Sequence, residues 1–461
     1  MRKSSTDMTK GNVARQLLLF ALPILLGQIF QNLYNSVDAI VVGRGVGKTA
    51  LAAVSASADI THLIVGFFTG LSTGAGILFA RSFGAKDYKK LHDAIHTSVT
   101  FYVILGVVMA AVGLVLTPLL LKLVACPDDV FREADAYLRI YFIGILFTAI
   151  YNIGAGVLRS VGDSRNPFIY LVIASVVNVI ADLVLVVLLK MGVRGAAIAT
   201  VVSQLLSVVL VFRRLIRAED VYKLKIRDLK IDRKLLLEIL DLGIPAAIQA
   251  SLIAISNMFV SRYINSFGSD AMAGIGAAKK IDRFVGMVAM SVGQALATFI
   301  GQNFGANRLD RAFRSIRVSI LFNLVYILAL GSVIFSFAGF FVRIFTTDEN
   351  AIRYGVDMIH IMMPFYFMQS LNQIFANAVR GFGKSRVVML CSIFGMIGCR
   401  QIFLAITMSI KRSVTFVYLG FPFGWMMAAL LVMIYFYFAI YRKYHAEARE
   451  TAALHKDDPD R

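Results

Sequence analysis

The second half of the chain repeats motifs of the first half at a constant offset, and this duplication limits the folds that the chain can adopt. The stretch 158–165 reads Leu-Arg-Ser-Val-Gly-Asp-Ser-Arg and the stretch 379–386 reads Val-Arg-Gly-Phe-Gly-Lys-Ser-Arg, so the numbers of the arginines at their second positions differ by 380 − 159 = 221. The same offset relates Phe-Gly-Ala at 83–85 to Phe-Gly-Ala at 304–306. A period this long is not that of a solenoid repeat, so we expect two copies of one large unit.

Long apolar runs fill both copies. Hydrophobic residues make up 58% of the chain and charged residues 16%, whereas soluble domains are roughly 45–50% apolar. An apolar run of about 20 residues can cross a hydrocarbon core of about 30 Å as a helix, which satisfies its backbone hydrogen bonds internally. We therefore predict an all-α membrane protein with twelve transmembrane helices in two six-helix repeats. The predicted spans are 15–42, 50–80, 93–120, 134–158, 167–189, 195–214, 235–263, 271–302, 315–342, 354–379, 387–409 and 415–441.

The distribution of Lys and Arg predicts the orientation of the chain. Most of these residues lie on the side that holds the N-terminus, including the segment 213–234 and the tail after Tyr441. Positively charged loops stay cytoplasmic, so we expect both termini in the cytoplasm. Each half then has an even number of spans, which predicts parallel repeats. The predicted domains are an N-terminal six-helix lobe (1–214), a basic cytoplasmic linker (215–234), a C-terminal six-helix lobe (235–442) and a cytoplasmic tail (443–461).

The sequence argues against several functional classes. The net charge of +19 is spread over loops and tails, so anionic membrane lipids are expected partners and nucleic acid is not. The segment 42–49 resembles a phosphate loop, but Val42 stands where its first glycine is required. Cys126, Cys391 and Cys399 have no metal or redox spacing. We expect no cofactor, and no nucleophile–base or metal-ligand set indicates an enzyme.

Two carboxylates are predicted to lie inside the membrane, Asp38 on the first span and Asp182 on the fifth. A carboxylate in a span is costly and by default marks function. At 1.5 Å per residue, Asp38 and Asp182 lie about 7 Å and about 12 Å from the outer ends of their spans, and Thr200 lies about 9 Å into the sixth. Asn178 is one helical turn before Asp182 and shares its face. These four residues can form an oxygen-rich pocket for Na⁺, and two neighbouring carboxylates can instead hold a proton.

The second copy lacks these acids, because Cys399 and Phe403 stand at the positions of Asn178 and Asp182. Arg400, near the middle of the eleventh span, is a candidate partner of Asp357 or of a helix end. Other charges in the spans are open to two interpretations: ion pairs between the lobes that close the outer side, or long side chains that reach the membrane surface. They are Asp59, His62, Lys279, Lys280, Asp282 and Arg283.

Polar and soft apolar side chains recur along several spans, and the first and seventh spans are equivalent in the repeat. Such side chains can line a large, adaptable cleft for amphipathic ligands. The other interpretation is hydrogen bonding and ordinary packing between helices. The candidate cleft residues are Gln31, Tyr34, Asn35, Asn152, Gln204, Gln249, Asn257, Met287, Tyr366, Gln369 and Asn372.

Four groups of residues carry a resemblance to a known family. They are Leu22-Pro23-Ile24, Asn35-Ser36-Val37-Asp38, the run Gly301-Gln302-Asn303-Phe304-Gly305-Ala306, and the paired motifs that begin at Arg159 and Arg380. With these motifs the chain resembles the multidrug and toxic compound extrusion (MATE) transporters, and the similarity covers nearly the whole chain. Within that family it is similar to the DinF-like branch.

The resemblance implies a V-shaped pair of lobes, with a first helix that bends near Pro23. It implies export of organic, cationic or amphipathic compounds such as drugs in exchange for H⁺ or Na⁺, by a monomer in the bacterial inner membrane. The cation site of the DinF-like branch corresponds to Asp38, Asn178, Asp182 and Thr200. The segment 248–260 of the seventh span contains no acid, which argues against coupling through the C-terminal lobe.

Two other functions compete with this interpretation. A flippase for lipid-linked precursors, built on a related duplicated fold, would need a strongly cationic cleft, and Lys279, Lys280, Arg283 and Arg400 could supply one. A membrane-embedded enzyme is the weakest hypothesis, because no catalytic set is found among the motifs.

Overall fold

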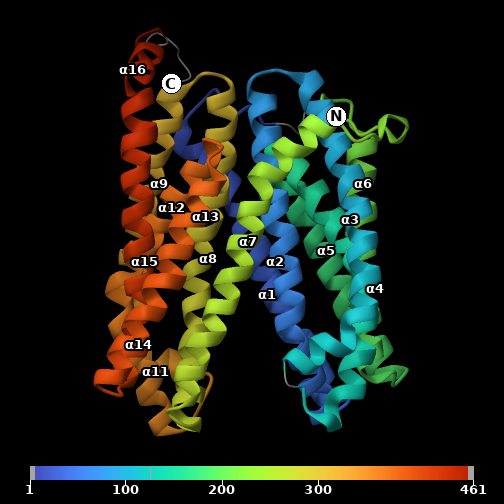
Figure 1. Ribbon diagram of the computed structural model, residues 1–461. Coiled ribbons are helices and arrows are strands. Elements are labelled where there is room, and N and C mark those ends of the chain that lie inside the picture. Colours follow the sequence, from blue (N-terminus) through green and yellow to red (C-terminus); the bar gives the residue numbers. More distant parts are fainter. Residues whose placement is uncertain (1–5, 125, 455–461) are drawn as a thin grey trace. The chain divides into compact units, whose positions relative to one another are not determined.

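The structure is a computed structural model, and it describes residues 6–124 and 126–454 (Figure 1). In those residues the chain is helical with short connections and contains no strand. The helices of the first half are α1 (Val13–Gly45), α2 (Lys48–Gly84), α3 (Tyr88–Leu123), α4 (Asp128–Ser160), α5 (Arg165–Asp182), the π-helical turn η1 (Leu183–Leu188) and α6 (Gly192–Ile216).

A short 3₁₀ turn, η2 (Ile226–Asp228), lies between the two halves. The helices of the second half are α7 (Arg233–Asn265), α8 (Ser269–Gly305), α9 (Leu309–Ser336), α10 (Ala338–Arg343), α11 (Glu349–Met362), the 3₁₀ turn η3 (Met363–Phe365), α12 (Tyr366–Gly381), α13 (Ser385–Ser392), the π-helical turn η4 (Ile393–Cys399), α14 (Arg400–Ile410), α15 (Val414–Tyr435), the π-helical turn η5 (Phe436–Tyr441) and α16 (Arg442–Leu454).

Eleven helices in the described residues are long and apolar enough to cross a membrane. The predicted span 354–379 is absent from this set because η3 divides it into α11 and α12. Pro364 lies at the start of η3 and has no backbone N–H to continue the helical ladder. The predicted all-α membrane fold is thus confirmed, with one of the predicted spans broken in its course.

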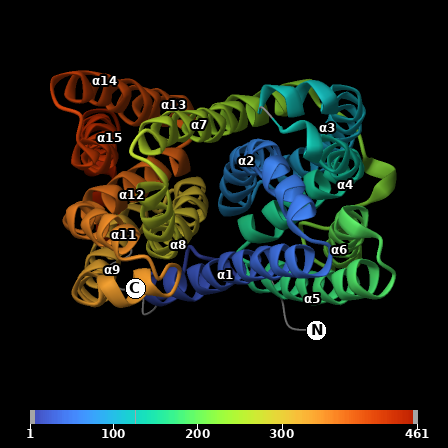
Figure 2. The same ribbon diagram turned by 90° about the horizontal axis from the view of Figure 1, so that it is seen from below.

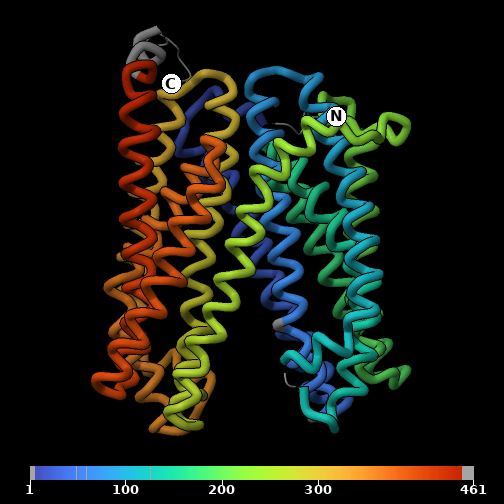
Figure 3. Tube along the Cα trace, in the orientation of Figure 1, coloured from blue at the N-terminus to red at the C-terminus, as the bar shows by residue number. Residues whose placement is uncertain are grey.

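The backbone, traced in Figure 3, repeats its turns at the same offset as the sequence. Positive φ angles recur at Gly47 and Gly268, at Lys86 and Asn307, and at Gly162 and Gly383, always at the separation 268 − 47 = 307 − 86 = 383 − 162 = 221. Helices α2 and α8 are both 37 residues long. The two halves therefore share the positions of their turns, even where the turn residue has changed.

Contacts divide the chain into two compact units, which do not follow the covalent halves at two places. Of the described residues, unit 1 holds those within Met1–Asp7 and Leu22–Ala247, and unit 2 holds those within Met8–Ala21 and Ile248–Arg461. The first residues of α1 thus belong to unit 2, and the first part of α7 belongs to unit 1. The predicted lobe boundaries and the V-shaped arrangement of the lobes stay predictions.

Unit 1 is built around α4, which packs against α2, α3 and α6. Glycines permit this close approach: a Cβ added at Gly144 would lie 2.6 Å from Val201 of α6. The segment before α7 is fastened to α3, where the backbone N–H of Lys225 donates to His96 Nε2 (3.0 Å). Helices α5 and α6 run beside each other (Figure 2).

Unit 2 is built around α8, which packs against α9, α11 and α12, while α15 packs against α12 and η4. The segment Met8–Ala21 is held in this unit by Arg311 of α9. The guanidinium group donates to the carbonyl oxygens of Gly11 (2.7 Å) and Lys10 (3.0 Å) and to Gln16 Oε1 (3.2 Å).

Candidate functional site: a buried carboxyl pair in unit 1

The candidate site lies where α1 meets the end of α5. Phe30 of α1 and Phe168 of α5 stack edge to face with ring centroids 5.9 Å apart, which holds the two helices together. Helix α5 ends at Asp182, and the π-helical turn η1 begins at the next residue. π-helical turns occur frequently at functional sites, because the extra residue in the turn changes the direction of nearby side chains and leaves backbone groups less regularly paired.

The carboxyl groups of Asp38 and Asp182 lie within hydrogen-bonding reach of each other. Asp182 is 0% exposed. Neither of its oxygens, nor Oδ1 of Asp38, accepts a hydrogen bond from a donor in the described part of the chain. Asp38 is half-buried, so three of the four oxygens of the pair are buried without a donor. Two ionised carboxylates in this setting would repel each other and lack solvation, so the pair requires a proton or a cation between them.

Asn178 completes the polar surface one turn before Asp182. It is 1% exposed, and both atoms of its side-chain amide lack a hydrogen-bond partner among the described residues. Carboxylate and amide oxygens are the ligands that hard cations such as Na⁺ and Ca²⁺ prefer. The donor set therefore fits a small cation, and it fits a shared proton equally well.

Thr200 is buried on α6, the helix that packs against α5. Its hydroxyl donates to the carbonyl oxygen of Ala196 in its own helix (3.1 Å), and its oxygen keeps the capacity to accept or to bind a cation. Of the four residues predicted to form the cation site, the structure thus brings the two carboxyl groups together and places Asn178 on the same helix face as Asp182. The binding of a cation there stays a prediction.

Two tyrosines lie beside the pair and Tyr141 lies beside them; of the three, only Tyr34 was among the candidate cleft residues. Tyr34 and Tyr137 lie close enough to both carboxyl groups to interact with them electrostatically. Tyr137 and Tyr141 stack with ring centroids 6.3 Å apart, and Tyr141 lies beside Gln204. Tyrosines four residues apart share one face of α4, but the sequence does not show what that face packs against.

The candidate cleft residues fall in both units, and several already have partners. In unit 1, Asn152 accepts hydrogen bonds from Thr69 (3.4 Å) and Ser72 (2.8 Å), whereas Gln31 and Asn35 are exposed. In unit 2, side chains bond as follows: Gln249 with Ser392 and Arg380, Asn257 with Arg400, Tyr366 with Asp282, and Asn372 with Met396. Met287 is buried and Gln369 is half-buried. Their role in a substrate cleft stays a prediction.

The predicted partner of Arg400 is different in the structure. Its guanidinium group donates to Asn257 and Ser256 of α7 and forms no ion pair with an acid in the described residues. Of the other charges, Asp282 accepts a hydrogen bond from Tyr366, and the side chain of Asp59 lies outside the described side chains. An ion-pair set between the lobes stays a prediction.

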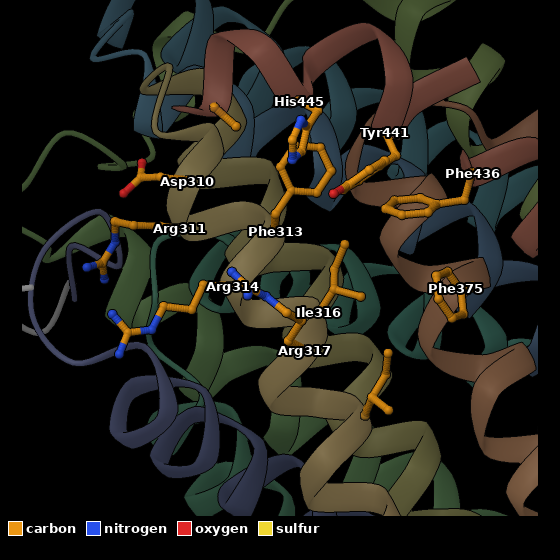
Figure 4. A pocket seen from close by; sticks show the side chains of 12 residues that line it. Asp310, Arg311, Phe313, Arg314, Ile316, Arg317, Phe375, Phe436, Tyr441 and His445 are labelled. Atoms are coloured by element: carbon orange, nitrogen blue, oxygen red, sulfur yellow. The ribbon is translucent and has the colours of Figure 1, made fainter. Parts of the chain in front are cut away.

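A groove in unit 2 lies apart from these residues, between α9, α12, η5 and α16 (Figure 4). Phe313 forms its wall with Tyr441, at 5.5 Å between ring centroids, and with Phe436, at 6.2 Å. Arg314 and Arg317 of α9 are exposed at its edge. None of the candidate cleft residues lines this groove.

Comparison with known proteins places these observations in a family. The family model MatE matches residues 23–184 and 245–406, so it matches the chain twice, with starting positions that differ by 245 − 23 = 222. The probable multidrug resistance protein YoeA of Bacillus subtilis (strain 168) is 31% identical over 444 residues, which cover 94% of this chain and 96% of the relative. The multidrug export protein MepA of Staphylococcus aureus (strain NCTC 8325 / PS 47) is 21% identical over 386 residues, covering 83% and 85%.

Solved structures show the same fold. An outward-facing multidrug resistance MATE family transporter of the MOP superfamily superimposes with a TM-score of 0.88 at 22% identity, covering 99% of this chain and 100% of the other. A MATE structure in a bent conformation gives a TM-score of 0.87, also at 22% identity, and covers 96% and 98%. The chain therefore belongs to the MATE family, and is a multi-pass membrane transporter rather than an enzyme.

Proposed function

We propose that this transporter exports organic compounds, cationic or amphipathic, in exchange for H⁺ or Na⁺ bound at the Asp38–Asp182 pair. The main observation behind the proposal is the pair itself: two adjacent carboxyl groups, three of whose four oxygens are buried with no donor among the described residues. The relatives named as multidrug resistance and export proteins support the substrate class.

Coupling follows from the place of the two acids on different helices. Without a cation, like charges on α1 and α5 push the two helices apart; a proton or Na⁺ between them draws the helices together. An ion that binds one conformation more tightly shifts the equilibrium toward it. Pro23 lies in α1, about four helical turns before Asp38, and leaves one carbonyl of the helix without its usual donor. We infer that α1 bends near Pro23 when the pair is occupied.

The ion gradient is large enough for this work. One monovalent cation that enters the cell down a potential of about 150 mV releases about 3.5 kcal/mol. This energy corresponds to a concentration ratio of a few hundredfold for the exported compound. Export also requires that substrate and cation favour opposite states, and linkage then makes their effects on each other's affinity reciprocal.

Counterflow in proteoliposomes tests the proposal. Vesicles loaded with a fluorescent organic cation are given a Na⁺ gradient or a proton gradient separately, with the wild-type chain, Asp38→Asn or Asp182→Asn. We expect flux driven by one of the two gradients and lost in both variants, because an amide cannot balance a bound cation. The gradient that drives the flux identifies the coupling ion.

Asp135→Asn is the matched control, since this acid of unit 1 pairs with Arg139 (2.7 Å) and lies outside the carboxyl pair. Its flux should equal that of the wild type. Full gradient-driven flux in Asp182→Asn would overturn the role of the pair. Flux driven by neither gradient in the wild type would overturn export of organic cations as the substrate class.

We further propose that the protein works as a monomer in the bacterial inner membrane, with its termini in the cytoplasm.

Anionic lipids are proposed to bind at the groove beside Arg314 and Arg317, because exposed arginines next to an aromatic wall suit a phosphate headgroup with an acyl chain. Native mass spectrometry with added phosphatidylglycerol should show bound lipid, and less of it in the double variant Arg314→Gln/Arg317→Gln. Equal lipid binding by wild type and variant would place the lipids elsewhere.

A further inference from the structure

Unit 2 contains a buried cation that the coupling mechanism does not use. Arg400 is 2% exposed and lies ten residues before the end of α14 at Ile410, about 15 Å along the helix. Its Nη1 donates to Asn257 Oδ1 (3.0 Å), its Nη2 donates to Ser256 Oγ, and its Nε has no partner among the described residues. A buried guanidinium with only neutral acceptors and one unused N–H is costly, and inside a membrane protein it marks a functional site.

A second cation lies next to it. Lys279 Nζ of α8 is 5.7 Å from the ring centroid of Phe421, and Arg400 Cζ is 5.4 Å from the same centroid. The two cations interact electrostatically with each other. The nearby Asp282 attracts Lys279 but also accepts a hydrogen bond from Tyr366. With Arg400, Lys279 and Asp282 ionised, the cluster has a net positive charge.

The duplication shows that this cluster occupies the counterpart of the carboxyl pair. Subtracting 221 from 400 gives 179, the residue after Asn178. In the first half, helices one and five of the repeat carry Asp38 and Asp182. In the second half, the equivalent helices α7 and α14 carry the acceptors of Arg400 and Arg400 itself. The same pair of helices thus presents acids in one copy and a base in the other.

We propose that Arg400 and Lys279 bind the acidic headgroup, a carboxylate or a phosphate, of an amphipathic substrate. A guanidinium group offers a fork of N–H donors that fits both headgroups, and the ammonium of Lys279 supplies a second charge. Phe421 and the neighbouring Trp425, with ring centroids 6.4 Å apart, give an apolar wall for the rest of the molecule. The assignment of this ligand as transported cargo rests on the proposed export function; the binding of an acid does not.

The site contains its own fluorescent reporter. Trp425 is the one tryptophan of the chain, is 4% exposed, and lies 5.5 Å from Tyr366 and 6.4 Å from Phe421 between ring centroids. A ligand that contacts Arg400 and Lys279 therefore changes the surroundings of the only indole. The full-length protein in nanodiscs of zwitterionic lipid is titrated with four probes: octyl phosphate, octanoate, octyltrimethylammonium and inorganic phosphate.

We expect saturable changes in Trp425 fluorescence with octyl phosphate and octanoate, and none with octyltrimethylammonium, whose tail is the same. Inorganic phosphate should bind more weakly than octyl phosphate by about tenfold or more, because burying each CH₂ of the tail contributes about 0.8 kcal/mol. Equal affinity for octyl phosphate and inorganic phosphate would mean that the apolar tail is not bound, and would overturn the proposal of an amphipathic substrate. Equal responses to the anionic and cationic amphiphiles would overturn the anion site.

Arg400→Gln and Lys279→Gln should each weaken octyl phosphate binding by about tenfold or more, as expected when one partner of a buried charged contact is removed. Arg343→Gln is the control, because this arginine of α10 pairs with Glu349 (2.8 Å) and is not part of the cluster. If Arg400→Gln does not yield folded protein, the test uses Lys279→Gln, because the side chain of Lys279 is only half-buried. Unchanged affinity in the folded variants would overturn the assignment.

The two proposals can fail separately. Asp182→Asn should keep octyl phosphate binding while it loses gradient-driven flux. Binding of octyl phosphate without gradient-driven flux of either the organic cation or octyl phosphate would overturn the exchange mechanism alone. Flux without anion binding would overturn the present inference alone. A fluorescent isoprenoid phosphate presented in the bilayer separates the two sources of the headgroup: its translocation, with no export of octyl phosphate, would favour the lipid-linked flippase over export of free acids.

Discussion

At the scale of single residues, the unpaired amide of Asn178 indicates that the carboxyl pocket is built for binding and not for stability. Both of its amide atoms are buried without partners among the described residues. Replacing such a group by an apolar residue of similar size is nearly neutral or stabilising. We therefore expect Asn178→Leu to keep or raise the apparent Tm and to lower the flux driven by the coupling ion, measured in the same protein preparation.

Asn303 of α8 is the control for this experiment, because its amide donates to Met8 and Phe299 and accepts from Arg311. Asn303→Leu should lower stability by about 1–3 kcal/mol, since it leaves buried partners unpaired. If Asn178→Leu destabilised the protein as strongly as Asn303→Leu, the amide of Asn178 would have a structural role.

The sequence predicted the acids of the site better than their surroundings. Asp38 and Asp182 were identified because a carboxylate in an apolar run is rare and their depths along the helices agree. The proximity of Tyr137 was not predicted, because tyrosine is an ordinary residue in apolar spans and only packing shows which face it occupies. For Arg400 the sequence suggested Asp357 or a helix end as the partner, but the structure provides Asn257 and Ser256, since neutral side chains give no charge signal in the sequence.

At the scale of elements, close helix packing in unit 1 depends on glycines whose neighbours leave no room for a side chain. A Cβ added at Gly113 of α3 would overlap the ring of Phe142, which is buried on α4. Overpacking of this kind typically costs about 1–3 kcal/mol. We expect Gly113→Ala to lower the apparent Tm, as measured by thermal unfolding in detergent.

Gly276 of α8 provides the opposite case, because a Cβ there would meet nothing within 4 Å. Gly276→Ala should stabilise the protein by about 0.5–1 kcal/mol, because alanine loses less backbone entropy in a helix. A lower Tm for Gly276→Ala than for Gly113→Ala would contradict the packing seen in the structure.

Helix boundaries were predicted where a glycine turn separates two helices. They were missed where a helix changes from α-helical to π-helical geometry. Gly162 and Gly383 lie in the duplicated motifs, Gly47 and Gly268 lie between predicted spans, and all four have positive φ. The π-helical turns η1 and η4 lie in continuous apolar runs, and the two glycines of η4, Gly395 and Gly398, are ordinary residues in such a run, so hydrophobic periodicity does not reveal these turns. They begin at 183 and 393, which differ by 210 rather than 221. The backbone has thus diverged between the copies on the same helices where the charges diverged.

At the scale of the whole molecule, parallel repeats predict that equivalent residues of the two halves lie on the same side of the membrane. Lys190 and Lys411 are equivalent, since 411 − 190 = 221, and each follows a helix of the fifth position in its repeat. Lys223 lies between the halves, and Lys384 lies between α12 and α13. If both repeats face the same way, Lys190 and Lys411 lie outside the cell, whereas Lys223 and Lys384 lie in the cytoplasm.

Single cysteines test this arrangement in a chain whose Cys126, Cys391 and Cys399 are replaced by alanine. A membrane-impermeant maleimide should label Lys190→Cys and Lys411→Cys in intact cells, and should label Lys223→Cys and Lys384→Cys only after the cells are permeabilised. Labelling of Lys190→Cys from outside but of Lys411→Cys only after permeabilisation would mean that the halves are inverted. An inverted arrangement would relate the two halves by an axis in the plane of the membrane instead of one along its normal, so the symmetry that relates the acid site to the basic site depends on this measurement.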